Sequence, residues 1–318
     1  MRTWLTETLG VSAPVVSAPM AGVAGGALAA AVSQAGALGM IGVGAHTTPD
    51  WVDEQCAVVA EAGVPFGVGL QAWVLADMPG QLEAALATPA ALVSVSYGPY
   101  ERYVDTVHRA GRPIATSVGS ARAARHAADA GVDVLIARGA EGGGHGWDDV
   151  ATLPLLQSVL DRVDLPVLAA GGIGSARGLA AVLAAGAAGA WVGTAFLTCV
   201  ESMTSAWVRE RLSAAAETDT VYGRVFDIAA RAGWPSEFGE RALRNGFYDA
   251  WVGRESDLAV DDDAARAMRL AAQAHDADVL CLDAGQGVGL LNGDTTAAQV
   301  VAEFARAGAL LRAAAQGT

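Results

Sequence analysis

The stretch PIATSVGSARAARHAADAGVDVLIAR, residues 113–138, contains the pattern that decides the fold. Its two short apolar runs, Pro113–Val118 and Asp133–Arg138, predict strands, and the alanine-rich segment Ser120–Ala130 between them predicts an amphipathic helix. Gly131 follows the helix at the position where a left-handed backbone favours glycine. A strand, a helix and a strand in this order imply two parallel strands joined by a right-handed crossover.

The same unit recurs along the first two thirds of the chain. The expected strands are Val15–Met20, Leu38–Val43, Phe66–Gln71, Ala91–Tyr97, Pro113–Val118, Asp133–Arg138, Pro166–Ala170 and Gly189–Phe196. Helical patterns separate them. Eight such units within roughly 200 residues are typical of a (β/α)8 TIM barrel, an α/β fold. The rival is a doubly wound sheet, which would carry a glycine fingerprint after its first strand. The nearest match, Gly172–Gly178, follows the seventh strand instead.

The pattern changes beyond the eighth strand. Ser202–Ala216 and Asp261–Ala274 look helical, as does Thr296–Ala314 near the end, while Thr218–Val260 is richer in aromatic and charged residues. We therefore expect residues 1–200 and 280–318 to form the barrel. Residues 201–279 are expected to form an inserted helical subdomain.

Composition excludes several classes of protein. The chain of 318 residues is 53% hydrophobic with a formal net charge of −14, which argues against a nucleic-acid partner. Its three cysteines are far apart, so neither a disulfide framework nor a zinc site is expected. The uncharged region between Glu7 and Asp50 is broken by prolines and glycines, which argues against a membrane helix. With no signal peptide pattern at the N-terminus, we expect a cytoplasmic protein. A homo-oligomer is also possible.

The stretch EGGGHG, residues 141–146, follows the expected strand at Val134–Ala137. Three glycines remove side chains from the loop, so its backbone can approach a flat or anionic ligand closely. His145 follows them directly and can carry a proton either way near neutral pH. A surface turn with an incidental histidine is the alternative, and the loop alone does not decide between the two.

Two further glycine turns lie at the ends of the seventh and eighth strands. Gly171 and Gly172 precede a helix that begins near Ser175, and Gly193 and Thr194 end the next strand. Unpaired N–H groups and the helix dipole there favour an anion, so this pair of turns predicts a phosphate cradle. The Asp261–Asp263 run is interpreted as a helix cap, and no metal site is expected.

Met20, Gln71 and Arg138 lie at other strand ends, where a barrel places its ligand contacts. Met20 could instead be part of the hydrophobic core. Gln71 and Arg138 could instead be solvated residues at the ends of their strands. Of the remaining histidines, His46 could line the barrel mouth. The other three are expected on helices or at a helix end: His108, His126 and His275.

Four segments together resemble the nitronate monooxygenase family, formerly called 2-nitropropane dioxygenase, which uses FMN in a TIM barrel. They are Ala18–Gly22, Ala137–His145, Ala169–Ile173 and Gly193–Thr194. The resemblance extends from about residue 12 to the loop Gly285–Gly287. Flavin enoyl-ACP reductases and some NAD(P)H:quinone reductases share much of this pattern, so it is more specific for FMN than for a substrate.

The resemblance implies that His145 is the catalytic base. It also implies that FMN contacts Met20, Gln71, Arg138, Gly143, Gly171, Gly172, Trp191, Val192, Gly193, Thr194, Gln286 and Gly287. The family usually has Asn in place of Gln71 and Gln in place of Arg138. An arginine beside a flavin would stabilise a reduced, anionic ring, which bears on the choice of substrate.

The expected function is FMN-dependent oxidation of alkyl nitronates or nitroalkanes to a carbonyl compound and nitrite, with O2 as the second substrate. The first alternative is an NAD(P)H-dependent FMN reductase that acts on a quinone or an enoyl thioester. The second is a barrel without catalysis that binds a flavin or another phosphate ligand. The intact loop at His145 argues against the second.

Overall fold

The computed structural model describes residues 1–317, and its centre is a parallel eight-stranded barrel. The strands run β1-β9-β8-β6-β5-β4-β3-β2 around the sheet, and a parallel bridge between Val16 and Leu38 closes it. Their bounds are β1 (Val15–Ser17), β2 (Gly39–Gly42), β3 (Phe66–Gln71), β4 (Leu92–Ser96), β5 (Ile114–Val118), β6 (Val134–Arg138), β8 (Val167–Ala170) and β9 (Gly189–Val192). The predicted (β/α)8 TIM barrel is confirmed.

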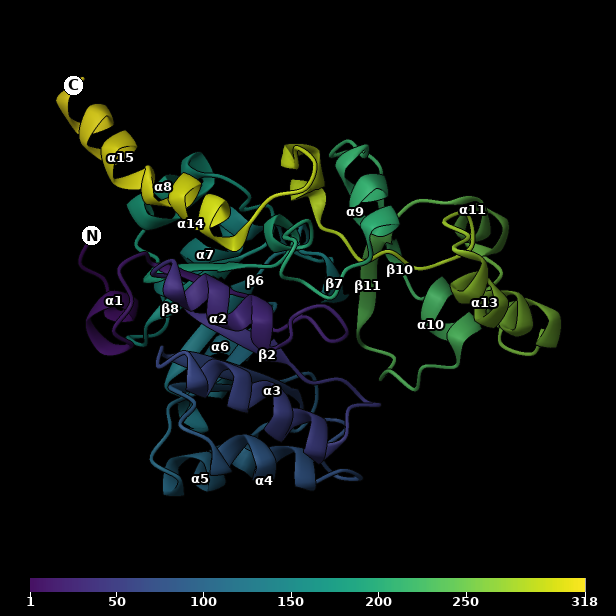
Figure 1. The fold of residues 1–318 in the computed structure, drawn as a ribbon, viewed down its shortest axis with the longest axis horizontal. Helices are drawn as coiled ribbons and strands as arrows, with labels where there is room; N and C mark the ends of the chain where they lie inside the picture. Colours follow the sequence, from purple (N-terminus) through teal and green to yellow (C-terminus); the bar gives the residue numbers. More distant parts are fainter. Residues whose placement is uncertain (318) are drawn as a thin grey trace.

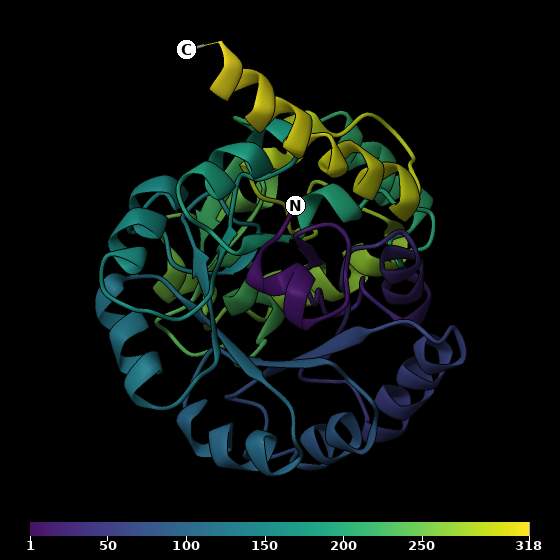
Figure 2. The same cartoon turned by 90° about the vertical axis from the view of Figure 1, so that its left-hand side faces the viewer.

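Helices surround the strands as a ring (Figure 2). They are α2 (Gly26–Gln34), α3 (Pro49–Glu61), α4 (Gly80–Ala87), α5 (Glu101–Arg109), α6 (Ala121–Asp129), α7 (Thr152–Leu160) and α8 (Ala176–Ala184). The start of α6 is fixed by Ser120, whose side chain accepts a hydrogen bond from the Ala123 N–H. Its end is followed by Gly131, whose φ of 89° confirms the left-handed position predicted from the sequence.

Two hydrophobic layers hold the barrel together. Side chains that point outward, such as Val93 and Leu135, pack against the helices. Inward side chains fill the interior, among them Val16, Met40 and Leu168. The short helix α1 (Trp4–Thr8) contributes Leu5 to this inner cluster, and Figure 2 shows α1 lying across the middle of the ring. The interior is therefore a packed core closed at one end, which leaves the other end for a ligand.

The region after β9 forms a subdomain beside the barrel (Figure 1). Its helices are α9 (Ala206–Ser213), α10 (Val225–Ala230), α11 (Gly246–Trp251), α12 (Glu255–Leu258) and α13 (Asp262–Ala274). Of these, α9 and α13 lie within the expected helices Ser202–Ala216 and Asp261–Ala274. The subdomain also contains two strands that the sequence did not predict, β10 (Thr220–Gly223) and β11 (Gly239–Leu243). The strand β11 pairs antiparallel with β10 on one side and with β7 (Gly144–Gly146) on the other, and β7 lies in the glycine-rich loop of the barrel. We propose residues 201–279 as the subdomain.

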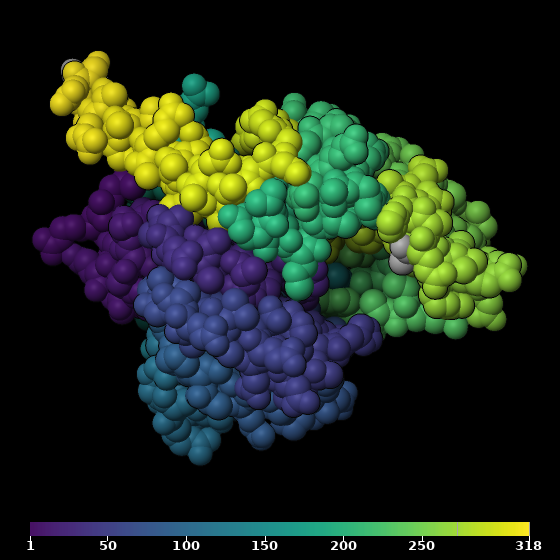
Figure 3. All heavy atoms as spheres, in the orientation of Figure 1, coloured from purple at the N-terminus to yellow at the C-terminus, as the bar shows by residue number. Residues whose placement is uncertain are grey.

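The chain then returns to the barrel. The 3-10 helix η2 (Gln286–Leu290) packs near η1 (Thr194–Phe196), and α14 (Ala297–Ala305) and α15 (Ala307–Gln316) pack against α2 and α8. Figure 3 shows the end of α15 projecting from the rest of the molecule. Within residues 1–317, no helix has both the length and the apolar character needed to span a bilayer.

Candidate active site

A cavity of about 970 Å³ opens where the barrel strands end. Its wall includes the last residues of β3, β6, β8 and β9, and the subdomain adds the opposite side. The predicted site residues that line it are Met20, Gln71, Arg138, Gly143, His145, Gly171, Gly172, Trp191, Val192, Gly193, Thr194 and Gly287. Gln286 is not part of the wall; its backbone N–H donates to the Glu141 carbonyl at 2.9 Å.

The two glycine turns after β8 and β9 line one end of this cavity. Gly171 and Gly172 have φ of 109° and 68°, and a Cβ on Gly171 would lie 2.7 Å from Thr152 Oγ1. The turn therefore brings bare backbone and the N-terminus of α8 to the cavity. Thr194 Oγ1 accepts a hydrogen bond from the Gly285 N–H at 3.0 Å, which holds the returning loop against this end. The arrangement fits a phosphate group.

Gln71 provides a second observation that fits a flavin. Its Oε1 atom is buried and has no hydrogen-bond partner among the described residues, although its side chain lines the cavity. A buried acceptor without a donor is costly, so a ligand donor is the natural partner. The edge of a flavin ring carries such an N–H group. Gln71 and the two glycine turns would therefore hold the ring and the phosphate of the cofactor.

Arg138 has a different set of partners from those expected. Its side chain is 5% exposed, and its guanidinium donates to backbone carbonyls of the glycine-rich loop, Gly142 and Gly144 at 2.8 Å and Trp147 at 3.1 Å among them. A Cβ on Gly146 would lie 2.3 Å from Arg138 Cζ, so only glycine permits this approach. Burial lowers the pKa of Arg138. Its donors organise the loop, and a direct role beside the flavin stays a prediction.

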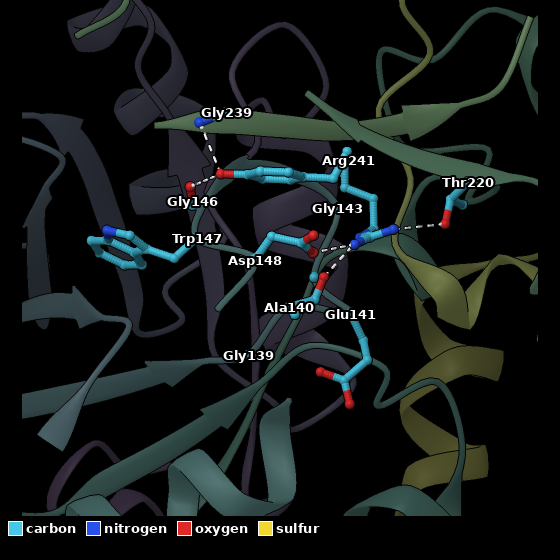
Figure 4. Close-up of polar contacts among 12 residues, drawn as sticks. Gly139, Ala140, Glu141, Gly143, Gly146, Trp147, Asp148, Thr220, Gly239 and Arg241 are labelled. Atoms are coloured by element: carbon cyan, nitrogen blue, oxygen red, sulfur yellow. Dashed lines mark hydrogen bonds and ion pairs between the residues drawn. The ribbon is translucent and has the colours of Figure 1, made fainter. Parts of the chain in front are cut away.

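The subdomain holds the same loop from the other side (Figure 4). Arg241 on β11 donates from Nε to the Ala140 carbonyl at 2.7 Å and forms an ion pair with Asp148. Tyr222 on β10 donates to the Gly146 carbonyl at 2.8 Å and accepts from the Gly239 N–H at 3.0 Å. Two arginines and one tyrosine thus hold a loop that has little side-chain packing of its own.

His145 lies at the centre of β7 and is fixed by the subdomain. Its Nε2 lies 3.0 and 3.1 Å from the two carboxylate oxygens of Asp227 on α10. The imidazole stacks on Trp234, with ring centroids 3.5 Å apart and planes 7° apart. Its side chain is 13% exposed. Because Nε2 is engaged by Asp227, Nδ1 is the ring nitrogen left to exchange a proton with a substrate.

Three further titratable groups lie next to His145 and Asp227: the carboxyls of Glu240 and Asp283 and the thiol of Cys281. Glu240 pairs with His145 across β11 and β7, and its Oε2 is 3.3 Å from Cys281 Sγ, which in turn is 3.6 Å from Asp283 Oδ1. Burial and the nearby charges of Asp283 and Asp227 raise the pKa of Glu240 well above its usual range. Burial also raises the pKa of Cys281. Burial therefore favours the neutral, protonated forms of both Glu240 and Cys281.

The sequence did not identify several residues around His145. Asp227 and Trp234 come from the region of unusual aromatic and charged content, which was the available signal. The other aromatic rings near Trp234 are Trp73, Tyr97 and Phe238.

The other histidines lie apart from this centre. His46 lines the cavity as expected, while His108, His126 and His275 contact Asp133, Glu101 and Trp207 respectively.

The barrel, its phosphate cradle and the positioned histidine together define a class of protein. This class is the flavin-dependent oxidoreductases with a TIM barrel. The family model for nitronate monooxygenase matches residues 2–78 and 71–306. The chain belongs to the nitronate monooxygenase family.

Individual relatives in this family differ in activity. A Rhodococcus jostii protein, (3aS,4S,5R,7aS)-5-hydroxy-7a-methyl-1-oxo-octahydro-1H-indene-4-carboxyl-CoA dehydrogenase, is 38% identical over 230 residues, 71% of this chain and 64% of that protein. The chain thus spans slightly less than two thirds of that relative. The structure of FabK from Thermotoga maritima has a TM-score of 0.87 at 28% identity, covering 100% of this chain and 99% of that one. Nitroalkane oxidase from Streptomyces ansochromogenes has a TM-score of 0.82 at 30% identity, covering 98% and 99%.

Gly172→Asp tests the phosphate cradle. The new carboxylate would face the phosphate, and a like charge about 5 Å away in a partly buried site weakens binding by roughly 100-fold. Gly172→Asn is the matched control because Asn has nearly the same shape without the charge and tolerates a positive φ. Flavin content after purification and reconstitution measures the effect. Equal flavin content in the two variants would remove the phosphate assignment.

Proposed function

We propose that this flavin-dependent oxidoreductase uses FMN and O2 to oxidise alkyl nitronates and nitroalkanes to a carbonyl compound and nitrite. The observation that carries the proposal is His145, positioned at the cavity by Asp227 with one ring nitrogen free for proton transfer. Nitroalkanes need such a base because their α-proton must be removed before oxidation. The family match and the similarity to nitroalkane oxidase support the same chemistry.

The geometry gives each protein group a distinct task. In the neutral imidazole, Nε2–H donates to Asp227 and Nδ1 accepts the α-proton of the substrate. The buried carboxylate of Asp227 stabilises the imidazolium that results and keeps the ring oriented, as the acid does in a Ser-His-Asp triad. Trp234 covers one face of the ring and limits its rotation. A bound flavin supplies the redox chemistry.

An NAD(P)H-dependent reductase for a quinone or an enoyl thioester is the second candidate. Part of the cavity wall is apolar and is formed by Val23, Leu197, Val208, Leu212 and Leu282, which suits the apolar part of a bulky substrate. The relative named as a CoA-ester dehydrogenase supports a bulky substrate. Anaerobic mixing separates the candidates. Bleaching of the flavin by NADH or NADPH selects the reductase, whereas bleaching by a nitronate, with nitrite released once O2 is admitted, selects the monooxygenase.

We also propose a cytoplasmic location. Cys56, Cys199 and Cys281 are all free thiols, which supports a reducing compartment.

The cofactor is expected to be FMN and not FAD. The described residues form one phosphate cradle, at the ends of β8 and β9, with no second glycine fingerprint for an adenylate group. Mass spectrometry of the cofactor released by heat measures this directly. Release of FAD, or failure to bind FMN on reconstitution, would contradict the assignment.

His145→Asn should slow turnover of a neutral nitroalkane by ~10²–10⁴-fold, the usual contribution of general-base catalysis, while FMN stays bound. The loss should be smaller with a preformed nitronate, since its α-proton is already gone. Turnover of both forms is compared at matched flavin content. Wild-type turnover of the neutral form by the variant would place the base elsewhere. An equal loss with both forms would assign His145 to binding or charge stabilisation.

A further inference from the structure

Tyr97 is a residue of the cavity wall that the proposed chemistry does not use. It directly follows β4, and its backbone has a φ of 66°, in the left-handed region that a bulky residue rarely adopts. Its carbonyl accepts a hydrogen bond from the Trp73 N–H at 3.0 Å, which fixes the backbone there. Glycine would take the same conformation without strain, so a contribution that offsets the strain is expected from the side chain.

Packing accounts for the aromatic ring of Tyr97 but not for its hydroxyl. The ring lies edge-on to Trp234 and Phe238, with ring centroids 5.4 Å apart in each pair, and 6.4 Å from the ring of Trp147. A phenylalanine would make the same contacts. The hydroxyl has no hydrogen-bond partner among the described residues, and its oxygen is not fully buried. Because the residue lines the cavity, a ligand can supply the missing partner.

Trp234 brings Tyr97 to the same part of the cavity as the proposed base. Its indole stacks on the imidazole of His145, with ring centroids 3.5 Å apart, and also contacts the ring of Tyr97. Both Tyr97 and His145 line the cavity. The α-carbon and the oxygens of a nitroalkane are only two bonds apart, so one small substrate can present its α-proton to His145 and an oxygen to Tyr97.

The charge of Arg138 favours an oxygen that carries negative charge at this end of the cavity. Its guanidinium donates to backbone carbonyls and forms no ion pair with a carboxylate of the described residues. Burial lowers the pKa of Arg138 and Tyr97 opposes that shift, so the phenol lies within range of the guanidinium charge. Burial also raises the pKa of the neighbouring Asp283, which favours its neutral form. A nearby cation stabilises negative charge on an acceptor oxygen.

We propose that Tyr97 is a further catalytic residue, whose hydroxyl donates a hydrogen bond to an oxygen of the substrate's nitro or nitronate group. As His145 Nδ1 takes the α-proton, the electron pair of the C–H bond moves into the nitro group and negative charge gathers on its oxygens. A donor fixed at that position stabilises this charge, as the donors of an oxyanion hole do. The proposal rests on the proposed function for the identity of the acceptor.

The first test uses binding of an inert ligand and needs no turnover. Propanoate has two oxygens in the planar, anionic arrangement of a small nitronate, and changes in flavin absorbance on titration of the holoenzyme report its Kd. Tyr97→Phe should weaken propanoate binding by roughly 10- to 100-fold, the usual effect of one hydrogen bond to a charged acceptor. Tyr103→Phe is the matched control and should bind like the wild type, since it removes the same hydroxyl from α5, outside the cavity wall.

The second test separates the two nitro forms by kinetics. Tyr97→Phe should raise KM for a preformed nitronate, whose oxygens are charged when it binds. For a neutral nitroalkane it should lower kcat, because the charge develops only as the α-proton leaves. Flavin content and the thermal unfolding temperature should stay at the wild-type level, since the phenylalanine keeps the ring contacts. A merely structural role of Tyr97 would change stability without this division between KM and kcat.

Three outcomes would overturn the proposal. The first is a wild-type holoenzyme that does not bind propanoate, a result that needs no variant to fold. The second is unchanged propanoate affinity in Tyr97→Phe with its flavin retained. The third is loss of the flavin from Tyr97→Phe, which would assign the hydroxyl to the cofactor. A failure of the proposed function looks different: the weaker propanoate binding of Tyr97→Phe would persist, while neither nitro compound released nitrite.

Discussion

The hydrogen bond between His145 Nε2 and Asp227 is the contact on which the site depends, because it joins two parts of the chain that are 82 residues apart. The barrel provides the histidine on a loop that carries few side chains. The subdomain provides the carboxylate that orients it and the indole of Trp234 that covers it. Without the subdomain, the loop would have a histidine of undefined orientation, and a base must lie within hydrogen-bond reach of its proton.

The glycine-rich loop can take this position because polar side chains hold its backbone from both sides. Arg138 lies beneath it and Arg241 and Tyr222 lie over it, each bonded to its carbonyls. Buried carbonyls need such donors, since unsatisfied ones are costly. The glycines are required for the same reason: a side chain at Gly146 would collide with Arg138. A loop that looks flexible in sequence is therefore a fixed part of the site.

The sequence predicted the barrel because its signals are local. Each strand, helix and terminal glycine of a unit such as residues 113–138 is specified within about 30 residues, and eight repetitions leave few topologies. The residues that line the cavity could be predicted as well, because the carboxyl ends of all the barrel strands meet at one face. The pairing of β7 with β11 was not predicted, because three residues with two glycines carry no strand pattern of their own.

The contacts of Arg138 with the glycine-rich loop and of Asp227 with His145 were not predicted, for a related reason. A buried arginine at a strand end can face a ligand or a neighbouring loop, and only the fold decides which. Asp227 lies in a short helix with no motif, and its meaning comes from the residue it touches.

The most direct test of this account is the protonation of the two ring nitrogens of His145, measured by 15N NMR on imidazole-labelled holoenzyme. The account predicts a neutral ring with the proton on Nε2, bonded to Asp227, and an unprotonated Nδ1. In Asp227→Asn that preference should be lost while the flavin stays bound. A wild-type ring with its proton on Nδ1, or an Nε2 proton that persists unchanged in Asp227→Asn, would contradict it.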